Sequence, residues 1–478
     1  MKYSIEVKEY GTYDVLVCGG GTAGVMAAIA AARMGAKTMV LERSFALGGM
    51  LTIGNAGITK FSEHCEDVNC YKTEVLDQLQ NDAKQVQVVG GIPLEFVERM
   101  ISKGTALGTH GTAGSYVFTD KCEAQWTLME MLEESGAEIL YDTRVCAPIL
   151  EGDKLVGVIV CNKEGFSRID ASCIIDATGD ADVAALAGVP YFKGANEDDV
   201  KEGSAVAIGQ MMHFGTMYRV RNVNFNALFD YLEENPDRYH QHEFGVMSLE
   251  NAKESYQNGQ MCVFRVLVDV PGEGRKPVQV YNLPTKDEAI LLGPYCQVWN
   301  MDGLNAREVS ISQKLCQTGP ERLNELLRKS VPGFEYVKTT FVPDVGIRET
   351  RHIIGEHRLT GIEVLSGRDF IDSIGCGGHP IDIHPIPPEL ENMEMNHWRF
   401  HIPYRIMIPL KVERLLVTGR CVSATRIASG AIRPTAQCMV MGEAAGTAAA
   451  LAVKSGKTPR EIDIQELRAI LKQNGVVL

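Results

Sequence analysis

The apolar and polar positions near the N-terminus alternate between short buried strands and one helix of small residues. Residues 14–18, DVLVC, form an apolar run of strand length, and an Ala-rich helix follows to about Met34. Gly35 ends that helix, and residues 38–42, TMVLE, form a second apolar run. Strand, glycine turn, helix and strand in this order predict a βαβ unit with a right-handed crossover.

The rest of the chain continues the same alternation and is interrupted once. The further predicted elements are a helix over 120–136, strands near 138–146, 155–161 and 168–175, a strand and glycine turn over 172–182, a strand at 414–419, a small-residue helix over 442–454 and an amphipathic helix over 459–473. Between about Val189 and Val342 the chain is more polar, with scattered aromatic residues and prolines. We therefore expect an α/β protein whose Rossmann-like domain, 1–188 plus 342–478, is interrupted by an inserted α+β substrate or cap domain, 189–341.

A glycine-rich turn lies between the first strand and the first helix. Gly19, Gly21 and Gly24 form the pattern G-x-G-x-x-G, and Glu42 ends the second strand 18 residues after Gly24. The first glycine permits the tight turn, the second lets the backbone approach a pyrophosphate, and the third lets the helix pack closely on the strand. A carboxylate at position 42 can accept hydrogen bonds from an adenosine ribose. The context predicts dinucleotide binding.

Further motifs distinguish FAD from NAD. Gly48 and Gly49 follow Glu42, ATG closes a later strand at Ala177–Gly179, and LLVTGR at 415–420 precedes a Gly/Ala-rich helix. With IIDATGDADVAALAG, IDIHP, IPYR and GRCVSATRIASGAIRPTAQCMVMGEAAGTAAAL, these motifs cover nearly the whole chain. The chain resembles the FAD-dependent oxidoreductases with the glutathione-reductase-type FAD fold, related to the fumarate-reductase flavoproteins.

The resemblance implies a set of FAD-binding positions. The pyrophosphate would be lined by the two glycine turns: Gly19, Gly21, Thr22, Ala23, Gly24, Gly48 and Gly49. Glu42 would hold the ribose, Arg43 would flank the adenine, and the backbone at Val145 would contact the adenine. Ala177, Gly179 and Asp180 would lie on the pyrophosphate side. Gly419 and Arg420 occupy the place where many relatives have Gly-Asp against the ribityl chain, so the arginine is a departure. Pro434 to Met439 would begin a helix whose N-terminal dipole favours negative charge at flavin N1 and O2.

Composition restricts the partners and the compartment. The net charge of −14 disfavours nucleic acid as a partner, because such a chain repels phosphate backbones. The N-terminal residues carry mixed charge and no apolar core, which excludes a secretory signal, and the apolar segment near 23–32 is too short to span a membrane. The 13 cysteines have no regular spacing and are typical of reduced thiols. We therefore expect a cytoplasmic protein that binds neither nucleic acid nor membranes.

Candidate residues for the chemistry concentrate in the C-terminal third. Between 340 and 440 there are ten arginines and one lysine, and six histidines fall between 352 and 401. Histidine can move protons near neutral pH, and guanidinium groups bind carboxylates in two-pronged fashion. The candidates are His384 in IDIHP, then His379 in GGHP, with Tyr404, Arg405 and Arg433; for each of them a purely structural role is the alternative.

Other cofactors are disfavoured. The histidine spacings match no zinc pattern, so no metal is expected. Cys65 and Cys70 have the C-x4-C spacing of a redox-active disulfide, but they lie too far after Gly49 for the disulfide-reductase arrangement, and free thiols are expected. A second G-x-G-x-x-G in a βαβ context is missing from the sequence, so a dedicated NAD(P)H domain is not expected. Electrons must then enter or leave through the substrate, through an external donor or acceptor, or through oxygen.

The sequence thus predicts an enzyme in which FAD exchanges a hydride at N5 with a small organic substrate: an activated alkene, a carbon–carbon bond beside a carbonyl, or an alcohol or sugar. Three alternatives remain open: an oxygen-using flavin monooxygenase, a tRNA-modifying flavoprotein, which the acidic charge disfavours, and a non-catalytic binding module with the same fold.

Overall fold

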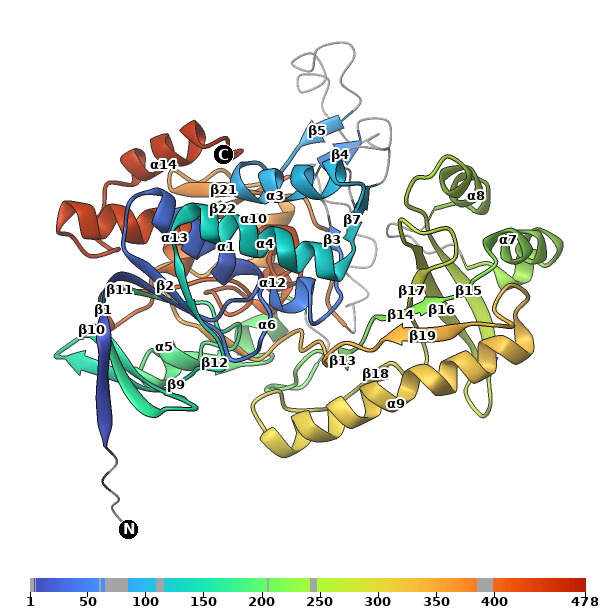
Figure 1. The fold of residues 1–478 in the computed structure, drawn as a ribbon, viewed down its shortest axis with the longest axis horizontal. Helices are drawn as coiled ribbons and strands as arrows, with labels where there is room; N and C mark the ends of the chain where they lie inside the picture. The colour runs from blue at the N-terminus through green and yellow to red at the C-terminus, as the bar shows by residue number, and fades with distance from the viewer. Residues whose placement is uncertain are drawn as a thin grey trace.

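The computed structural model describes residues 4, 6–59, 62–64, 85–108, 116–203, 206–240, 247–384 and 399–478. Two sheets dominate it, and they lie side by side in Figure 1, with both ends of the described chain in the part built around the first sheet. This is the expected α/β architecture, a Rossmann-like body that carries a second α+β body.

The first sheet has seven strands in the order β8-β2-β1-β11-β10-β9, with β23 also paired to β11. Strands β8, β2, β1 and β23 run parallel to their neighbours in this sheet, whereas β10 pairs antiparallel with both β11 and β9. Their bounds are β1 Val7–Cys18, β2 Thr38–Leu41, β8 Glu138–Leu140, β9 Arg144–Glu151, β10 Lys154–Asn162, β11 Gly165–Asp176 and β23 Leu415–Val417. In β2 and in the last four residues of β1 every residue is buried, as expected where helices or loops cover both faces of a parallel sheet.

Close helix packing covers one face of this sheet. Helix α1 (Thr22–Arg33) lies against α13 (Thr435–Ser455), and a Cβ atom at Gly442 or Gly446 would lie 2.1 or 2.0 Å from the carbonyl oxygen of Ala23 or Ala27. The two backbones therefore meet at small residues. Helix α13 is long and apolar enough to cross a membrane, and 94% of its apolar window is buried inside the protein. Its composition matches its place in the core.

One predicted strand is wrong in its extent. The sequence predicts a single strand over 138–146, but the structure divides it into β8 and β9, which lie at opposite edges of the sheet. The break falls at Asp142, whose φ of 50° is left-handed. Thr143 next to it donates its backbone N–H to the carbonyl of Glu42 at 3.0 Å. The turn thus carries the chain from one edge across the end of β2.

The second sheet has five strands in the order β15-β16-β17-β14-β19. Helices α7 and α8 lie at its outer end, and the long helix α9 runs along its length (Figure 1). The bounds are β14 Tyr218–Arg221, β15 Val263–Val270, β16 Gly274–Asn282, β17 Ala289–Leu292, β19 Lys338–Phe341, α7 Phe225–Glu234, α8 Leu249–Gln257 and α9 Ala306–Ser330. Its core consists of buried residues between Tyr218 and Val337, whereas β12 (Tyr191–Lys193) pairs with β20 (Arg351–Ile353) and stays with the first body.

The remaining elements connect and cover these two bodies. The strands are β3 Ile58–Thr59, β4 Ser62–His64, β5 Gln85–Gln87, β6 Ala106–Gly108, β7 Tyr116–Thr119, β13 Phe214–Gly215, β18 Gln297–Val298, β21 Ser373–Gly377 and β22 Phe400–Pro403. The helices are α3 Gly91–Ser102, α4 Lys121–Ser135, α5 Asp182–Leu186, α6 Glu197–Lys201, α10 Gly361–Leu365, α12 Arg426–Ile432 and α14 Ile464–Gln473, with short 3-10 turns η1 Gly49–Leu51, η4 Pro236–Arg238 and η5 Tyr404–Met407. Helix α14 begins five residues later than position 459, where the sequence predicts it.

Candidate active site

The first glycine turn has the geometry that a pyrophosphate needs. Gly19 follows β1 with a φ of +106°, and a Cβ atom at Gly24 would lie 1.8 Å from the carbonyl oxygen of Gly19, so the helix can pack here only without a side chain. A Cβ atom at Gly21 would meet nothing within 4 Å. Gly21 is the N-cap of α1 and supplies no side-chain cap, which leaves the first backbone N–H groups of the helix available to an anion.

A second glycine loop closes over the first. The N–H of Gly48 donates to the carbonyl of Gly20 at 2.9 Å, and the hydroxyl of Thr22 donates to the carbonyl of Gly48 at 2.9 Å. Glu42 lies beneath them, where one carboxylate oxygen accepts from Gly20 N at 2.8 Å and the other from the N–H and hydroxyl of Ser44, each at 2.7 Å. The carboxylate is fixed in place, and the oxygen that accepts from Gly20 keeps acceptor capacity for a ribose hydroxyl.

The opposite wall is built where two neighbouring parallel strands end. Asp180 follows β11, Arg420 follows β23, and a guanidinium nitrogen of Arg420 lies 2.9 Å from the carboxylate of Asp180. That carboxylate also accepts from the hydroxyl of Thr350 at 2.7 Å. Burial works against the charge of Arg420, but Asp180 outweighs it and raises the pKa of the guanidinium. The other terminal nitrogen, Nη1, is buried and has no protein partner within the described ranges.

These walls enclose one long cleft with about 1540 Å³ of empty space, its solvent-open part included. Of the predicted FAD-binding residues, those that line it are Gly19, Gly21, Thr22, Ala23, Glu42, Arg43, Gly49, Val145, Ala177, Gly179, Asp180, Gly419 and Arg420. Gly24 and Gly48 shape the two turns from behind. Met439 is fully buried in the core, so its side chain packs there and does not face the cleft.

The far end of the cleft reaches the start of α13. Pro434 is the N-cap of this 21-residue helix and offers no side-chain cap, while Thr435 and Cys438 of the first turn line the cleft. Met50, Ile53 and Ile347 line the same cleft. The partial positive charge of the helix N-terminus beside apolar side chains suits a flat ring system that carries negative charge on one edge.

The sequence of the whole chain fits one family. A family model for FAD-dependent oxidoreductases matches residues 14–471. This chain belongs to the FAD-dependent oxidoreductase family. The predicted family, the FAD cofactor and the assignment as an enzyme are therefore confirmed, and the cradle of cleft-facing glycines, the fixed Glu42 carboxylate and the orphaned donor of Arg420 fit the cofactor.

Individual relatives are distant. A protein described as uncharacterized, from the nifH2 5' region of Methanosarcina barkeri, is 27% identical over 193 residues, which are 39% of this chain and 93% of that protein. A geranylgeranyl bacteriochlorophyll reductase-like protein from Thermoplasma acidophilum has a TM-score of 0.43 and 15% identity, covering 98% of this chain and 84% of that one. A myxobacterial chondrochloren halogenase has a TM-score of 0.45 and 11% identity, covering 97% and 79%. The family assignment rests on the family model.

A polar cluster adjoins the α13 end of the cleft in this FAD-dependent oxidoreductase. Arg433, which lines the cleft between α12 and α13, places Nη2 2.7 Å from the Asp382 carboxylate and 2.6 Å from its carbonyl oxygen. Nε2 of His384 lies 2.8 Å from the other carboxylate oxygen of Asp382. Burial opposes the negative charge of Asp382, but Arg433 and His384 outweigh it and hold the pKa of the carboxyl well below its usual range. Asp382 therefore orients both side chains as an anion.

The segment that leads into the second body completes this cluster. His213, only 3% exposed, makes an edge contact with His384 at 4.9 Å between ring centroids and stacks on Trp299 at 4.3 Å. Burial above all, and then the nearby charge of Arg348, lowers the pKa of His213 to about 2, so the ring is neutral. Within the described part of the chain both of its ring nitrogens lack a hydrogen-bond partner. Arg348 donates from Nη1 to the backbone carbonyl of His213 at 3.1 Å.

The structure separates the predicted catalytic residues into two groups. His384 and Arg433 meet in the polar cluster, whereas Arg405 pairs with Asp372 at 2.9 Å and Tyr404 donates its buried hydroxyl to the carbonyl of Pro459 at 2.8 Å. Neither Arg405 nor Tyr404 is among the residues that line the cleft. His379 is 9% exposed, with Nδ1 2.6 Å from the carbonyl oxygen of Pro380.

Several cluster residues were missed by the sequence reasoning. His213 and Trp299 belong to the predicted insertion and carry no motif, and Arg348 is one of the ten arginines between 340 and 440 but is not among the candidates. Asp382 lies in IDIHP, two residues before His384, and that spacing was the one available signal. Cys65, Cys70 and His397 lie outside the described residues. Among the residues with described positions, no three His, Cys, Asp or Glu side chains gather closely enough to hold a metal ion.

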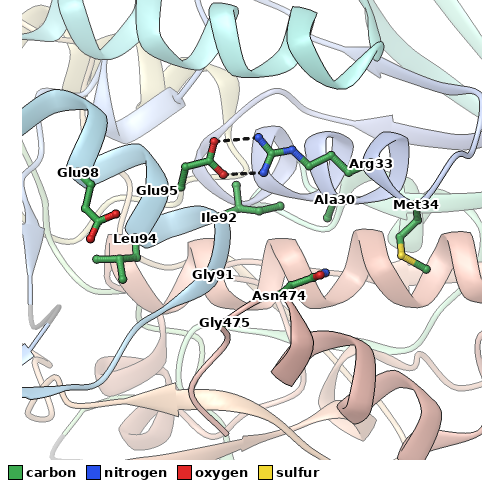
Figure 2. A pocket seen from close by; sticks show the side chains of 10 residues that line it. All are labelled: Ala30, Arg33, Met34, Gly91, Ile92, Leu94, Glu95, Glu98, Asn474 and Gly475. Atoms are coloured by element: carbon green, nitrogen blue, oxygen red, sulfur yellow. Dashed lines mark hydrogen bonds and ion pairs between the residues drawn. The ribbon is translucent and has the colours of Figure 1, made fainter. Parts of the chain in front are cut away.

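A second cavity lies at the other end of α1. Figure 2 shows its lining from the last turn of α1, from α3 and from the chain after α14, with the ion pair between Arg33 and Glu95 at 2.6 Å joining two of these elements. Thr22 at the first turn of α1 faces the FAD cleft, whereas Ala30 and Met34 face this cavity. Because the helix separates the two by its own length, about 18 Å for 12 residues, the second cavity is remote from the glycine turn of the FAD cleft.

Proposed function

We propose that this FAD-dependent oxidoreductase exchanges a hydride between N5 of the flavin and a carbon of a small organic substrate at the polar cluster. The observation that carries the proposal is the cluster itself. It combines Arg433, Asp382 and His384 of the first body with His213 and Trp299 from the predicted insertion, and Arg433 also lines the FAD cleft. Bound FAD supplies a two-electron acceptor or donor at that end of the cleft.

His384 of the cluster can accept or donate the proton that accompanies a hydride transfer. Nε2 of His384 faces the ionised carboxylate of Asp382, so Nε2 carries the hydrogen and Nδ1 can accept a proton. Removing a hydride from a carbinol carbon forms a carbonyl when the hydroxyl proton leaves to His384. In the opposite direction the protonated His384 donates to the substrate atom that gains the electron pair. Its side chain is 37% exposed, which lets the proton pass to solvent afterwards.

The test follows the visible absorbance of the flavin without oxygen. Oxidised protein is mixed with a panel of alcohols, sugars and saturated carbonyl compounds, and reduced protein with activated alkenes and carbonyl compounds. The expected result is bleaching or reoxidation by one class, slowed about 10²- to 10⁴-fold in His384→Gln with FAD still bound. His357→Gln is the matched control, because His357 pairs with Glu363 at 3.1 Å outside the cluster.

Two outcomes would contradict the proposal. Turnover that requires oxygen and leaves an oxygen atom in the product would replace hydride exchange with the monooxygenase alternative. Unchanged turnover in a fully flavinated His384→Gln protein would remove His384 from the proton transfer.

A further inference from the structure

We infer that the substrate is an organic acid whose carboxylate is bound by Arg348, with Arg433 beside it, at the boundary between the FAD cleft and the segment that carries His213. This deepens the proposed function and rests on it, since the same cluster holds the reacting carbon.

Among the side chains that the structure describes in the cluster, the charges do not balance. Arg348 and Arg433 contribute two cations, while Asp382 contributes one anion that is already bound to Arg433 and His384. Among the described residues, Arg348 has no carboxylate within ion-pair distance; its recorded hydrogen bond goes to a neutral backbone carbonyl. Burial, followed by repulsion from Arg433, lowers the pKa of Arg348 to about 10, so it stays charged at neutral pH.

An unbalanced cation in a protected site is unfavourable unless an anion joins it. A guanidinium has five N–H donors, and Arg348 uses Nη1 on the His213 carbonyl, which leaves donors for a planar two-oxygen group. A carboxylate matches this fork and supplies the missing charge. Since Ile347, the preceding residue, and Arg433 both line the FAD cleft, an anion held here lies next to the cofactor site.

His213 adds an independent observation at the same place. His213 is 3% exposed and its ring is neutral. Neither ring nitrogen has a hydrogen-bond partner among the described residues. Burying such a group without a hydrogen bond costs free energy, so a polar ligand is the natural partner. A neutral imidazole suits an uncharged hydroxyl or carbonyl oxygen, and Trp299 stacked behind it fixes the ring.

The test measures binding to the oxidised holoenzyme, separately from turnover. Acetate, glycolate and lactate are titrated while changes in the visible flavin spectrum are followed, and their amides serve as neutral probes of nearly the same shape. We expect saturable binding of the acids and none of the amides. Arg348→Lys should weaken the acids about 10- to 100-fold, because an ammonium cannot reproduce the planar fork. Arg307→Lys, on the exposed face of α9, is the matched control and should bind like wild type.

Each other outcome has a defined meaning. Equal binding of acids and amides, or unchanged affinity in Arg348→Lys, overturns the carboxylate assignment. Binding of inorganic phosphate in place of every carboxylate overturns it too and leaves a phosphate ester as the substrate. If glycolate and lactate bind as expected but neither they nor any class of the substrate panel changes the redox state of the flavin, the proposed function is contradicted while the anion site stands. If Arg348→Lys does not fold, the comparison of acids with amides on wild type still decides.

Discussion

The guanidinium of Arg426 lies 2.8 Å from the carboxylate of Glu349, and both side chains are fully buried. Arg426 also donates to the backbone carbonyls of Gln210 at 2.7 Å and His384 at 3.0 Å, and Glu349 accepts from the N–H of Met212 at 2.8 Å. One ion pair therefore connects the segment before His213 with the segment that carries Asp382 and His384. It is a positioning pair for the polar cluster, and neither residue is among those that line the FAD cleft.

Removing one partner of this pair should be strongly destabilising. We expect Glu349→Gln to lower the free energy of unfolding by about 3–5 kcal/mol, because it removes the ion-pair partner of the buried Arg426 and leaves the weaker attraction of Asp199. The double variant Glu349→Gln with Arg426→Met should recover part of that loss. Chemical denaturation of the flavinated proteins measures both values. Losses that simply add in the double variant would show that the two side chains are not coupled.

The sequence predicted the architecture well because local patterns determine it. The glycine turn, the βαβ unit and the carboxyl-end motifs at Gly179 and Gly419 are short, and each has a physical reason that can be read locally. The strand over 138–146 was wrong because a left-handed residue, Asp142, does not show in an apolar pattern.

The polar cluster could be predicted only in part. IDIHP pointed to His384, but His213 lies 171 positions earlier in the chain and meets it only through tertiary folding. IPYR suggested Tyr404 and Arg405 as candidates. In the 3-10 turn that begins at Tyr404, however, the guanidinium of Arg405 pairs with Asp372 and the hydroxyl of Tyr404 donates to the carbonyl of Pro459. Side-chain direction, unlike the element itself, is set by neighbours that are remote in sequence.

Arg420 should contribute to FAD affinity as a charged pair with Asp180. Without Arg420 the Asp180 carboxylate would stand unpaired on the predicted pyrophosphate side of the cleft. We expect Arg420→Gln to weaken FAD binding about 10- to 100-fold and Arg420→Gln with Asp180→Asn to recover part of it. Flavin fluorescence on titration of the apoprotein measures the dissociation constant. Arg168→Gln is the control: it removes the ion pair between Arg168 and Asp170, which both lie on β11 and outside the cleft. It should leave the dissociation constant of FAD unchanged. Equal affinities in all variants would show that Arg420 does not act on the cofactor.

Gly446 should be intolerant of even one methyl group. Its Cβ would lie 2.0 Å from the carbonyl oxygen of Ala27, a backbone atom that cannot move without shifting α1. We expect Gly446→Ala to destabilise the protein by about 1–3 kcal/mol although alanine favours helices. Thermal unfolding measures the change, and Lys454→Ala at an exposed position of the same helix is the control. A variant as stable as wild type would mean that α1 and α13 separate easily.

Stability should fall as pH rises through the titration of Glu443. This side chain lies on α13, is 1% exposed, and its Oε2 accepts from the N–H of Ile92 at 2.9 Å. Burial, only partly offset by that hydrogen bond and by Arg33, raises the pKa of Glu443 to about 8, and the nearby Glu95 adds to the rise. In the unfolded chain the pKa of a glutamate is about 4.3.

Between these two pKa values the folded protein holds a proton that the unfolded chain has released. The unfolding free energy therefore decreases as pH rises from about 4.3 to about 8 and levels off above that range. Glu443→Gln mimics the protonated form, so its melting temperature should exceed that of wild type most at about pH 8 and least at about pH 5. Asp176, whose pKa burial raises to about 6, contributes to both proteins and cancels in their difference. Melting curves recorded with saturating FAD measure this difference. Glu466→Gln, on the exposed face of α14, is the control. A difference in melting temperature between Glu443→Gln and wild type that is the same at every pH would contradict the titration of Glu443.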